Sequence, residues 1–251
     1  MKVTFPQAKE IKNILPTIVS FLSEGTFKAN KDGIFLSSLD PANVAVILLD
    51  IYPNMFTEYD VQNEEKFTIN LEDLKKIMTR VALKNQMSWE IDREKNKFVL
   101  TVYGKAKKVF TLPLIESEGS FMDLSKSELP ELSVKVEMDS KAFYDIIESA
   151  KVIADEIKIV ADPEGPKVSF IAEGELKDMR IDLTPQDESV LSMEVPSKAM
   201  SRYSIDYLYK LSKVATISDT LTLKLDSGKP IWIDYKSTDK FKFGFVLAPR
   251  E

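Results

Sequence analysis

The sequence predicts an α+β protein made of two similar domains, each an antiparallel sheet with two helices on one face. Patterns typical of a helix, a hairpin, strands, a second helix, a hairpin and a strand occur twice in the same order. Helices interspersed among strands without regular alternation argue against a doubly wound parallel sheet. The apolar residues of one predicted helix also recur 134 positions later, which matches Leu71 with Ile205, Leu74 with Leu208, and Ile77 with Leu211.

The first half begins with a predicted amphipathic helix over residues 7–25, where apolar residues recur at helical spacing. We expect Pro16 to kink or split this helix and Gly25 to end it. A tight turn at residues 31–33 then separates two short strands. The apolar, β-branched residues 44–52 predict a further strand.

The second predicted helix of this half begins after Asn70, whose side chain is suited to cap it. Residues 87–104 alternate apolar and polar side chains around a polar turn and predict two strands. A last strand over residues 107–115 closes this half. Residues 1–115 are therefore expected to form the N-terminal domain.

The second half, residues 134–251, is expected to repeat this domain. Its predicted elements are a strand at 133–138, a helix with Phe143, Ile146, Ile147 and Ala150 inward, a strand–turn–strand at 157–175, strands at 179–183 and 190–195, a helix at 204–215, a hairpin at 221–236 and a strand at 241–249.

An acidic connector, residues 116–133, joins the two halves. It has five acidic residues against one lysine, with glycine, serine and proline typical of a loop. It also carries apolar residues that a free linker would avoid, at Phe121, Met122, Leu124, Leu129 and Leu132. This composition favours a tether that lies on a protein surface.

Composition argues against an enzyme. The 251 residues include no cysteine and no histidine, which excludes thiolate chemistry and the commonest general base and zinc ligand. The eight glycines are too dispersed for a dinucleotide or phosphate loop. We expect no catalytic residue, no metal and no cofactor. An enzyme based on carboxylates stays open as an alternative, although nothing in the spacing of Asp32, Asp40, Asp50 and Asp60 brings a pair together.

No segment reaches the roughly 18 apolar residues of a membrane span, and the first residues lack the apolar core of a signal peptide. We therefore expect an intracellular protein without a membrane partner. The net charge is −6, of which the connector supplies −4, so the remainder is nearly balanced. Basic residues on the predicted helices are either a solvated surface or a set of phosphate contacts. Without an arginine-rich recognition helix, any contact with nucleic acid would be independent of sequence.

Several strings, in their order, resemble the sliding-clamp family, proliferating cell nuclear antigen. They are GIFLSSLDP at 33–41, VAVILLDI at 44–51, FMDL at 121–124, LPEL at 129–132, LDSGKPIWIDY at 225–235 and FVLAPRE at 245–251. The resemblance covers essentially the whole chain. The lack of cysteine and histidine and the short tail favour an archaeal member.

The resemblance implies two similar domains joined by a connector, with three subunits closed into a ring around duplex DNA. Helices would line the hole and sheets would form the outer wall. The function implied is a processivity factor that tethers DNA polymerase, flap nuclease, DNA ligase and the clamp loader in DNA replication and repair. The subunits of the trimer would be copies of this chain or sister clamp chains. Location would be cytoplasmic and nucleoid-associated in an archaeon, and nuclear in a eukaryote.

The resemblance also implies three sets of site residues. The DNA-facing set is Lys9, Lys12, Lys76, Arg80, Lys84, Lys210 and Lys213. The pocket for a partner peptide with a glutamine and apolar and aromatic anchors is Leu39, Val44, Val46, Leu129, Pro230, Val246, Leu247 and Ala248. The subunit interface pairs strand 107–114 with strand 177–183 of the next subunit, through Lys108, Phe110, Leu112, Met179 and Ile181.

This chain departs from the family pattern at three residues. Val246 stands where many relatives have an aromatic residue. Asp145 and Glu148 lie where relatives often carry arginines, which makes the third helix a poorer phosphate binder, with Lys151 as a partial compensation. The alternative from a different functional class is a duplicated protein-interaction module that forms no ring.

Overall fold

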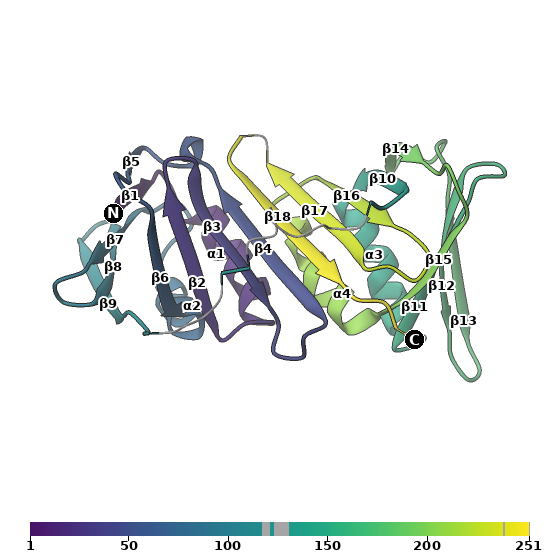
Figure 1. The fold of residues 1–251 in the computed structure, drawn as a ribbon, viewed down its shortest axis with the longest axis horizontal. Helices are drawn as coiled ribbons and strands as arrows, with labels where there is room; N and C mark the ends of the chain where they lie inside the picture. Colours follow the sequence, from purple (N-terminus) through teal and green to yellow (C-terminus); the bar gives the residue numbers. More distant parts are fainter. Residues whose placement is uncertain (117–120, 123–130, 238, 251) are drawn as a thin grey trace. The chain divides into compact units, whose positions relative to one another are not determined.

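The computed structural model describes residues 1–116, 121–122, 131–237 and 239–250, which fall into two compact units (Figure 1). Unit 1 contains Met1–Asn43, Ile47–Leu124 and Ser237–Phe243. Unit 2 contains Val44–Val46, Ser125–Lys236 and Gly244–Glu251. Each unit thus includes a short stretch of chain from the opposite half of the sequence.

Unit 1 has two runs of hydrogen-bonded strands, in the orders β5-β1-β7-β8-β9 and β6-β2-β3-β4. Its elements are β1 (Lys2–Phe5), α1 (Lys9–Val19), β2 (Glu24–Asn30), β3 (Gly33–Leu39), β4 (Ala45–Ile51), the short 3₁₀ helix η1 (Pro53–Met55), β5 (Glu58–Asp60), β6 (Glu65–Asn70), α2 (Leu71–Met78), β7 (Gln86–Asp92), β8 (Lys97–Tyr103) and β9 (Lys108–Pro113). The first two residues of β4 are counted with unit 2.

Unit 2 has the strand orders β14-β10-β16-β17-β18 and β15-β11-β12-β13. Its elements are β10 (Val134–Asp139), α3 (Ser140–Lys151), β11 (Glu156–Asp162), β12 (Lys167–Glu173), β13 (Asp178–Leu183), β14 (Val190–Glu194), β15 (Ala199–Ser204), α4 (Ile205–Ser212), the 3₁₀ helix η3 (Lys213–Thr216), β16 (Thr220–Leu225), β17 (Ile231–Ser237) and β18 (Phe241–Leu247). The first three residues of β18 are counted with unit 1.

The duplication predicted from the sequence is confirmed by the strand orders. Adding nine to each strand number of the first half gives the order of the second half in both runs, and α1 and α2 correspond to α3 and α4. The α+β class is also confirmed. Each unit contains strands of two sheets, whereas a single sheet was expected. Helix α2, for example, packs against β2 and β6 of one run and against β9 of the other.

In each unit, a residue next to β4 is hydrogen-bonded to a residue next to β18. In unit 1 the amide of Tyr52, just after β4, donates to the carbonyl of Lys240, just before β18, at 2.9 Å. In unit 2 the amide of Ala248 donates to the carbonyl of Val44, also at 2.9 Å. Under the duplication, β18 is the counterpart of β9, and β4 is the counterpart of β13.

Helix α1 is not split at Pro16 and does not extend to Gly25. It runs without a break from Lys9 to Val19 with Pro16 inside it, and it ends six residues before Gly25, which lies in β2. Pro16 is exposed, so water can bond the Lys12 carbonyl that its missing N–H would have served. The helix ends through Ser20, whose amide donates to the carbonyls of Pro16 and Thr17.

Both of the following helices carry a side-chain cap. The Oδ1 atom of Asn70 accepts the amide of Asp73 at 2.9 Å at the start of α2, as predicted. Asp139 accepts the amide of Ala142 at 2.7 Å at the start of α3. Their buried stripes then face the sheets, with Leu71, Leu74 and Met78 on α2.

Aromatic rings fill the core of unit 1. Trp89 on β7 is buried against Phe5 of β1 (4.9 Å between ring centroids), Phe98 of β8 (5.5 Å) and Phe27 of β2 (6.1 Å). Because Phe27 belongs to the β6-β2-β3-β4 run and the others to the β5-β1-β7-β8-β9 run, these rings join the two sheets of the unit.

We predict that Asn70→Ala lowers the free energy of unfolding by about 1 kcal/mol, because the Asp73 amide loses its acceptor. Chemical denaturation of the full chain measures this. Asn63→Ala, at an exposed position outside helices and strands, is the control and should leave stability unchanged. Equal stability of the two variants would contradict a capping role.

Candidate nucleic-acid and partner-binding surfaces

The basic residues predicted to face DNA lie on or just after the helices, and none is buried. In unit 1, α1 packs against α2. Lys9 is exposed at the start of α1, while the Lys12 ammonium donates to the carbonyl of Val81. Lys12 therefore connects α1 to the segment after α2. The other N–H groups of its ammonium remain available to a phosphate.

Helix α2 and the segment after it supply the other cations of unit 1. Lys76 is exposed but pairs with Asp73 at 2.9 Å, and the hydrogen bond that its ammonium donates to that carboxylate raises the pKa of Lys76. Arg80 and Lys84 are exposed. Of the residues that the structure describes, no carboxylate forms an ion pair with either one, so both present an uncompensated charge to solvent.

In unit 2, Lys210 of α4 pairs with Asp206 one turn earlier at 2.7 Å, and Lys213 begins η3. The acidic residues Asp145 and Glu148 are exposed on α3, as the sequence indicated for the solvent side of this helix. The cations of each unit thus lie on its helices, and their contact with DNA stays a prediction.

The pocket predicted for a partner peptide has an apolar strip in unit 2. Val44 is 37% exposed, and Val46, Pro230, Val246 and Ala248 are half-buried. The hydrogen bond between Ala248 and Val44 places the end of β18 beside the start of β4. The strip is therefore open to solvent and has a fixed backbone.

The structure corrects the predicted pocket at Leu247. Successive side chains of a strand point to opposite faces, so Leu247 points away from its neighbours Val246 and Ala248. Its side chain is 1% exposed and belongs to the core. Leu39 is half-buried at the end of β3 in unit 1, and Leu129 lies outside the described residues.

The described parts of the connector are bonded to the units. In unit 1 the amide of Met122 donates to the carbonyl of Ser37 at 3.3 Å, and the Lys28 ammonium is 5.8 Å from the ring centroid of Phe121. In unit 2 the Lys229 ammonium donates to the carbonyl of Glu131 at 3.2 Å. These contacts agree with the expectation of a tether that lies on a surface.

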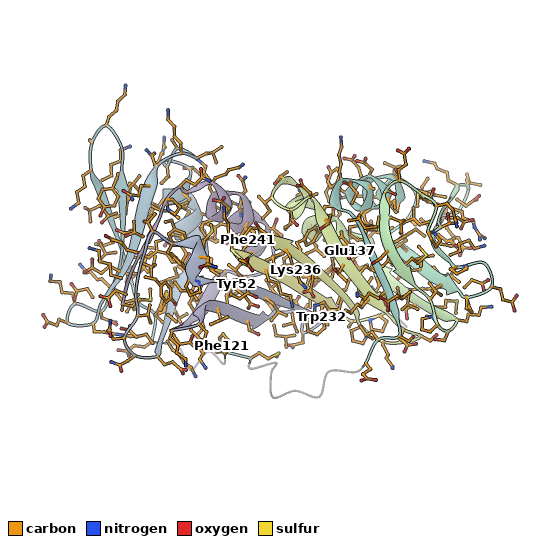
Figure 2. All side chains as sticks on the ribbon, turned by 90° about the horizontal axis from the view of Figure 1, so that it is seen from above. Tyr52, Phe121, Glu137, Trp232, Lys236 and Phe241 are labelled. Carbon is orange, nitrogen blue, oxygen red and sulfur yellow. The ribbon has the colours of Figure 1, made fainter. Side chains whose placement is uncertain are left out.

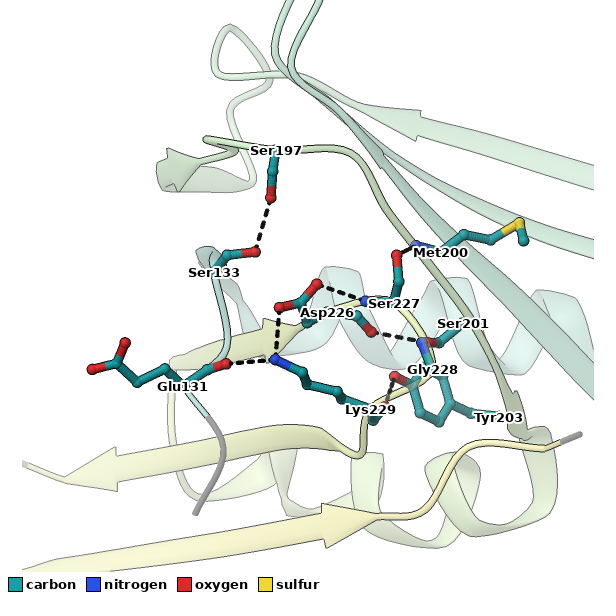
Figure 3. A network of polar contacts seen from close by, with 10 residues as sticks. All are labelled: Glu131, Ser133, Ser197, Met200, Ser201, Tyr203, Asp226, Ser227, Gly228 and Lys229. Atoms are coloured by element: carbon teal, nitrogen blue, oxygen red, sulfur yellow. Dashed lines mark hydrogen bonds and ion pairs between the residues drawn. The ribbon is translucent and has the colours of Figure 1, made fainter. Parts of the chain in front are cut away.

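A polar network around the β16–β17 turn orients Lys229 (Figure 3). Its ammonium also pairs with Asp226 at 3.1 Å, and its carbonyl accepts the hydroxyl of Tyr203 at 2.8 Å. The amide of Ser227 donates to Asp226 at 2.7 Å; this bond, more than the pairing with Lys229, lowers the pKa of Asp226. Lys229 is thus held on both sides before it meets the connector at Glu131.

Sequence reasoning missed a groove beside this network. It has a volume of about 710 Å³ and is lined by Glu131, Leu132, Ser133, Lys135, Glu194, Lys224, Asp226, Lys229 and Trp232. Trp232 is half-buried, and its indole N–H donates to Asp234 at 2.8 Å. It stands on the same face of unit 2 as Glu137 and Lys236 (Figure 2). In IWIDY, Trp232 and Asp234 alternate with Ile231, Ile233 and Tyr235, and this alternation was the available signal.

The two strands predicted to join subunits each have one neighbour in the described strand orders. Strand β9 pairs only with β8, and β13 pairs only with β12. Phe110, Met179 and Ile181 are half-buried at these edges, and Lys108 is exposed. Leu112, at 8% exposure, packs within its own unit and is open to a partner mainly through its backbone.

Comparison with known proteins identifies the family. The model for the proliferating cell nuclear antigen N-terminal domain matches residues 1–118, and the model for its C-terminal domain matches residues 128–250. The chain belongs to the proliferating cell nuclear antigen family. Members of this family of sliding clamps are non-catalytic scaffolds, so the chain is not an enzyme.

Relatives of the same length come from archaea. The DNA polymerase sliding clamp of Nanoarchaeum equitans is 39% identical over 253 residues, covering 100% of this chain and 99% of the relative. That of Pyrococcus furiosus is 32% identical over 251 residues, covering 99% and 98%. These relatives are of the archaeal type that we expected from the sequence.

Solved structures of the family are also similar. The clamp of Thermococcus kodakaraensis superposes with a TM-score of 0.89 at 26% identity, covering 99% of each chain. A chain of the PCNA2–PCNA3 complex from Sulfolobus tokodaii gives 0.90 at 27% identity, covering 100% of this chain and 99% of that one. Within the described part of this clamp chain, no cluster of three metal-ligating side chains occurs and no helix is long and apolar enough to span a membrane.

We predict that Lys229→Met speeds hydrogen–deuterium exchange of the amides at 131–133, because the connector loses its bond at the Glu131 carbonyl. Lys224→Met is the matched control, since this lysine lines the same groove without bonding the connector. The same exchange rates in both variants would show that Lys229 does not anchor the connector.

Proposed function

We propose that this chain is the subunit of a three-membered ring that encircles duplex DNA and tethers DNA polymerase as a processivity factor. One observation carries the proposal. Among the described strands, β9 and β13 lie at sheet edges, while their counterparts β18 and β4 are paired in the same chain. The duplication therefore supplies the geometry for joining β9 of one subunit to β13 of the next.

Pairing of these edges satisfies a physical need. An exposed edge leaves a row of unpaired N–H and C=O groups that favours association with another strand. A contact between two different edges is a head-to-tail contact, which closes into a ring when the rotation per subunit permits. The half-buried Phe110, Met179 and Ile181 would complete their burial there.

The charges of the two edges favour a second copy of this chain as the partner, with a sister clamp chain as the alternative. Before and within β9, the basic residues Lys105, Lys107 and Lys108 occur without an acid. Just before and at the start of β13, Glu175 and Asp178 have no basic partner among the described ion pairs, and Lys177 is the one basic residue between them. Opposite charges across the contact would guide the subunits into register.

The basic helices are proposed to face the DNA, with Lys9, Lys12, Lys76, Arg80, Lys84, Lys210 and Lys213 as the contacts. Several of these charges are partly committed to carboxylates of the same helix, which keeps the phosphate contacts weak. A closed ring needs no tight contact, because its topology retains the DNA. Weak contacts that ignore base sequence then allow sliding.

Partners are proposed to bind the apolar strip of unit 2 and the connector. A peptide with apolar and aromatic anchors would bury Val44, Val46, Pro230, Val246 and Ala248, with Leu39 and Leu129 completing the pocket. DNA polymerase, flap nuclease, DNA ligase and the clamp loader would share this surface in replication and repair. The clamp would then lie with the DNA, in the cytoplasm of an archaeon and associated with its nucleoid.

We predict that the purified chain assembles to a mass of about 85 kDa, three times its 28.5 kDa, and is retained on circular DNA after loading. Cutting the circle should release it, because only the ring holds the DNA. A protein that stays on linear DNA equally well would be the surface binder of the non-ring alternative.

A charge exchange tests the edges. Lys107→Glu with Lys108→Glu should lower the assembled mass toward 28.5 kDa, and Glu175→Lys with Asp178→Lys in the same chain should restore it. A wild-type chain that remains monomeric alone but assembles with a sister chain would leave the clamp function standing and refute self-assembly.

We predict that Ala248→Glu weakens binding of a partner peptide at least tenfold, which corresponds to about 1.4 kcal/mol, because a buried charge would face the anchors. Isothermal titration with a peptide carrying a glutamine and two aromatic residues measures this. Lys242→Glu, on the same strand but outside the strip, is the control. Unchanged affinity for Ala248→Glu would move the pocket elsewhere.

A further inference from the structure

Tyr209 of α4 contacts two lysines from different elements of unit 2. The Lys151 ammonium, at the end of α3, is 3.7 Å from the ring centroid, and the Lys213 ammonium, at the start of η3, is 4.8 Å from it. Both distances fall within the roughly 6 Å over which a cation is attracted to an aromatic face. One ring thus gathers two ammonium groups where α3 packs against α4 (Figure 1).

The contact with Tyr209 differs from the ion pairs that Lys76 and Lys210 form with carboxylates. A carboxylate partner orders Lys76 and Lys210 and offsets part of their charge, although Lys210 also lies 5.7 Å from the ring centroid of Tyr207. A tyrosine ring orders an ammonium group and leaves its full positive charge in place. No carboxylate of the described chain forms an ion pair with Lys151 or Lys213, and both lysines are exposed.

The acidic residue closest in sequence to Lys151 on this surface has a hydrogen-bond partner of its own. Glu148 accepts the hydroxyl of Tyr144, one turn earlier on α3, at 2.9 Å. Lys151 lies three residues after Glu148, and the described residues show no ion pair between the two side chains. The ring of Tyr144 also lies 6.0 Å from that of Tyr209 and extends the aromatic surface.

The duplication places both tyrosines where unit 1 has lysines. The buried stripe Phe143, Ile146, Ile147 and Ala150 of α3 follows that of α1, Ile11, Ile14, Leu15 and Ile18, by 132 residues. Tyr144 therefore corresponds to Lys12. With the 134-residue spacing of α2 and α4, Tyr209 corresponds to Lys75. An aromatic pair thus occupies two basic positions, and the charge has moved to Lys151 and Lys213.

We infer that Tyr209 is a positioning residue of the surface proposed to face DNA. Its ring holds Lys213, which is already among the proposed contacts, and it adds Lys151 as a further contact with backbone phosphates of a nucleic acid. The inference rests on the proposed function, since it names a contact on the surface proposed to face DNA. The ligand is the phosphodiester group, and the site reads no base.

The experiment measures equilibrium binding of the assembled full-length clamp to a short DNA duplex over a series of salt concentrations. Lys151→Met and Lys213→Met should each weaken binding and reduce the slope of log K against log salt by up to about 0.9, the value for one phosphate contact. Tyr209→Leu should weaken binding about two- to fivefold, while Tyr209→Phe, which keeps the ring, should bind as the wild type does.

The variants separate a positioning role from a structural one. Thermal unfolding and assembled mass should match the wild type in all four. Equal affinity and slope for Tyr209→Leu and Tyr209→Phe would overturn the positioning role, as would tighter binding by Tyr209→Leu. Unchanged slopes for both lysine variants would overturn the site, even if Tyr209→Leu failed to fold.

Arg80→Met of unit 1 distinguishes this inference from the proposed function. If Arg80→Met weakens binding while Lys151→Met and Lys213→Met do not, DNA contacts the clamp but not at this site. If none of the three affects binding, the helices do not face DNA, and the proposed DNA-facing surface fails with the inference.

Discussion

Backbone hydrogen bonding at the sheet edges is the constraint on which the rest of this clamp subunit depends. A duplicated domain has twice as many strand edges as a single copy, and each edge must be paired, covered or left open to association. Here β4 and β18 are bonded at Tyr52–Lys240 and Val44–Ala248, whereas β9 and β13 each have one neighbour among the strands that the structure describes. The proposed assembly follows from which of the described edges are left over.

The helices solve a different problem, because they must pack on the sheets and still offer charge to solvent. Their buried stripes meet the first need, as with Leu71, Leu74 and Met78 on α2. Their lysines meet the second need in three ways: tied to a carbonyl, as Lys12 is to Val81; paired with a carboxylate; or placed against a ring. These arrangements leave different amounts of charge free, so the basic residues of one surface are not equivalent.

Local rules predicted much of this fold from the sequence. The Asn70 cap and the tight turn at 31–33 depend on residues close in the chain, and both are present. The spacing between matching apolar residues predicted the duplication. The short strands β1, β5, β6 and β15 were missed, because three to six residues carry too little periodicity. The sequence also did not show that Pro16 lies on the side of α1 that meets water, where a proline inside a helix is tolerated.

The candidate surfaces were less predictable, because they depend on contacts between distant residues. Strand alternation buries Leu247 in the core. The resemblance of residues 245–251 to the family did not reveal this burial. The groove beside Trp232 and the bond from Lys229 to Glu131 join residues about a hundred positions apart.

The ring of Tyr209 has a consequence for solution behaviour. An aromatic ring attracts a cation without adding a carboxylate's full negative charge, so the two lysines that it holds keep their attraction for a polyanion. Dissolved salt would weaken this attraction, because both ammonium groups are exposed to solvent.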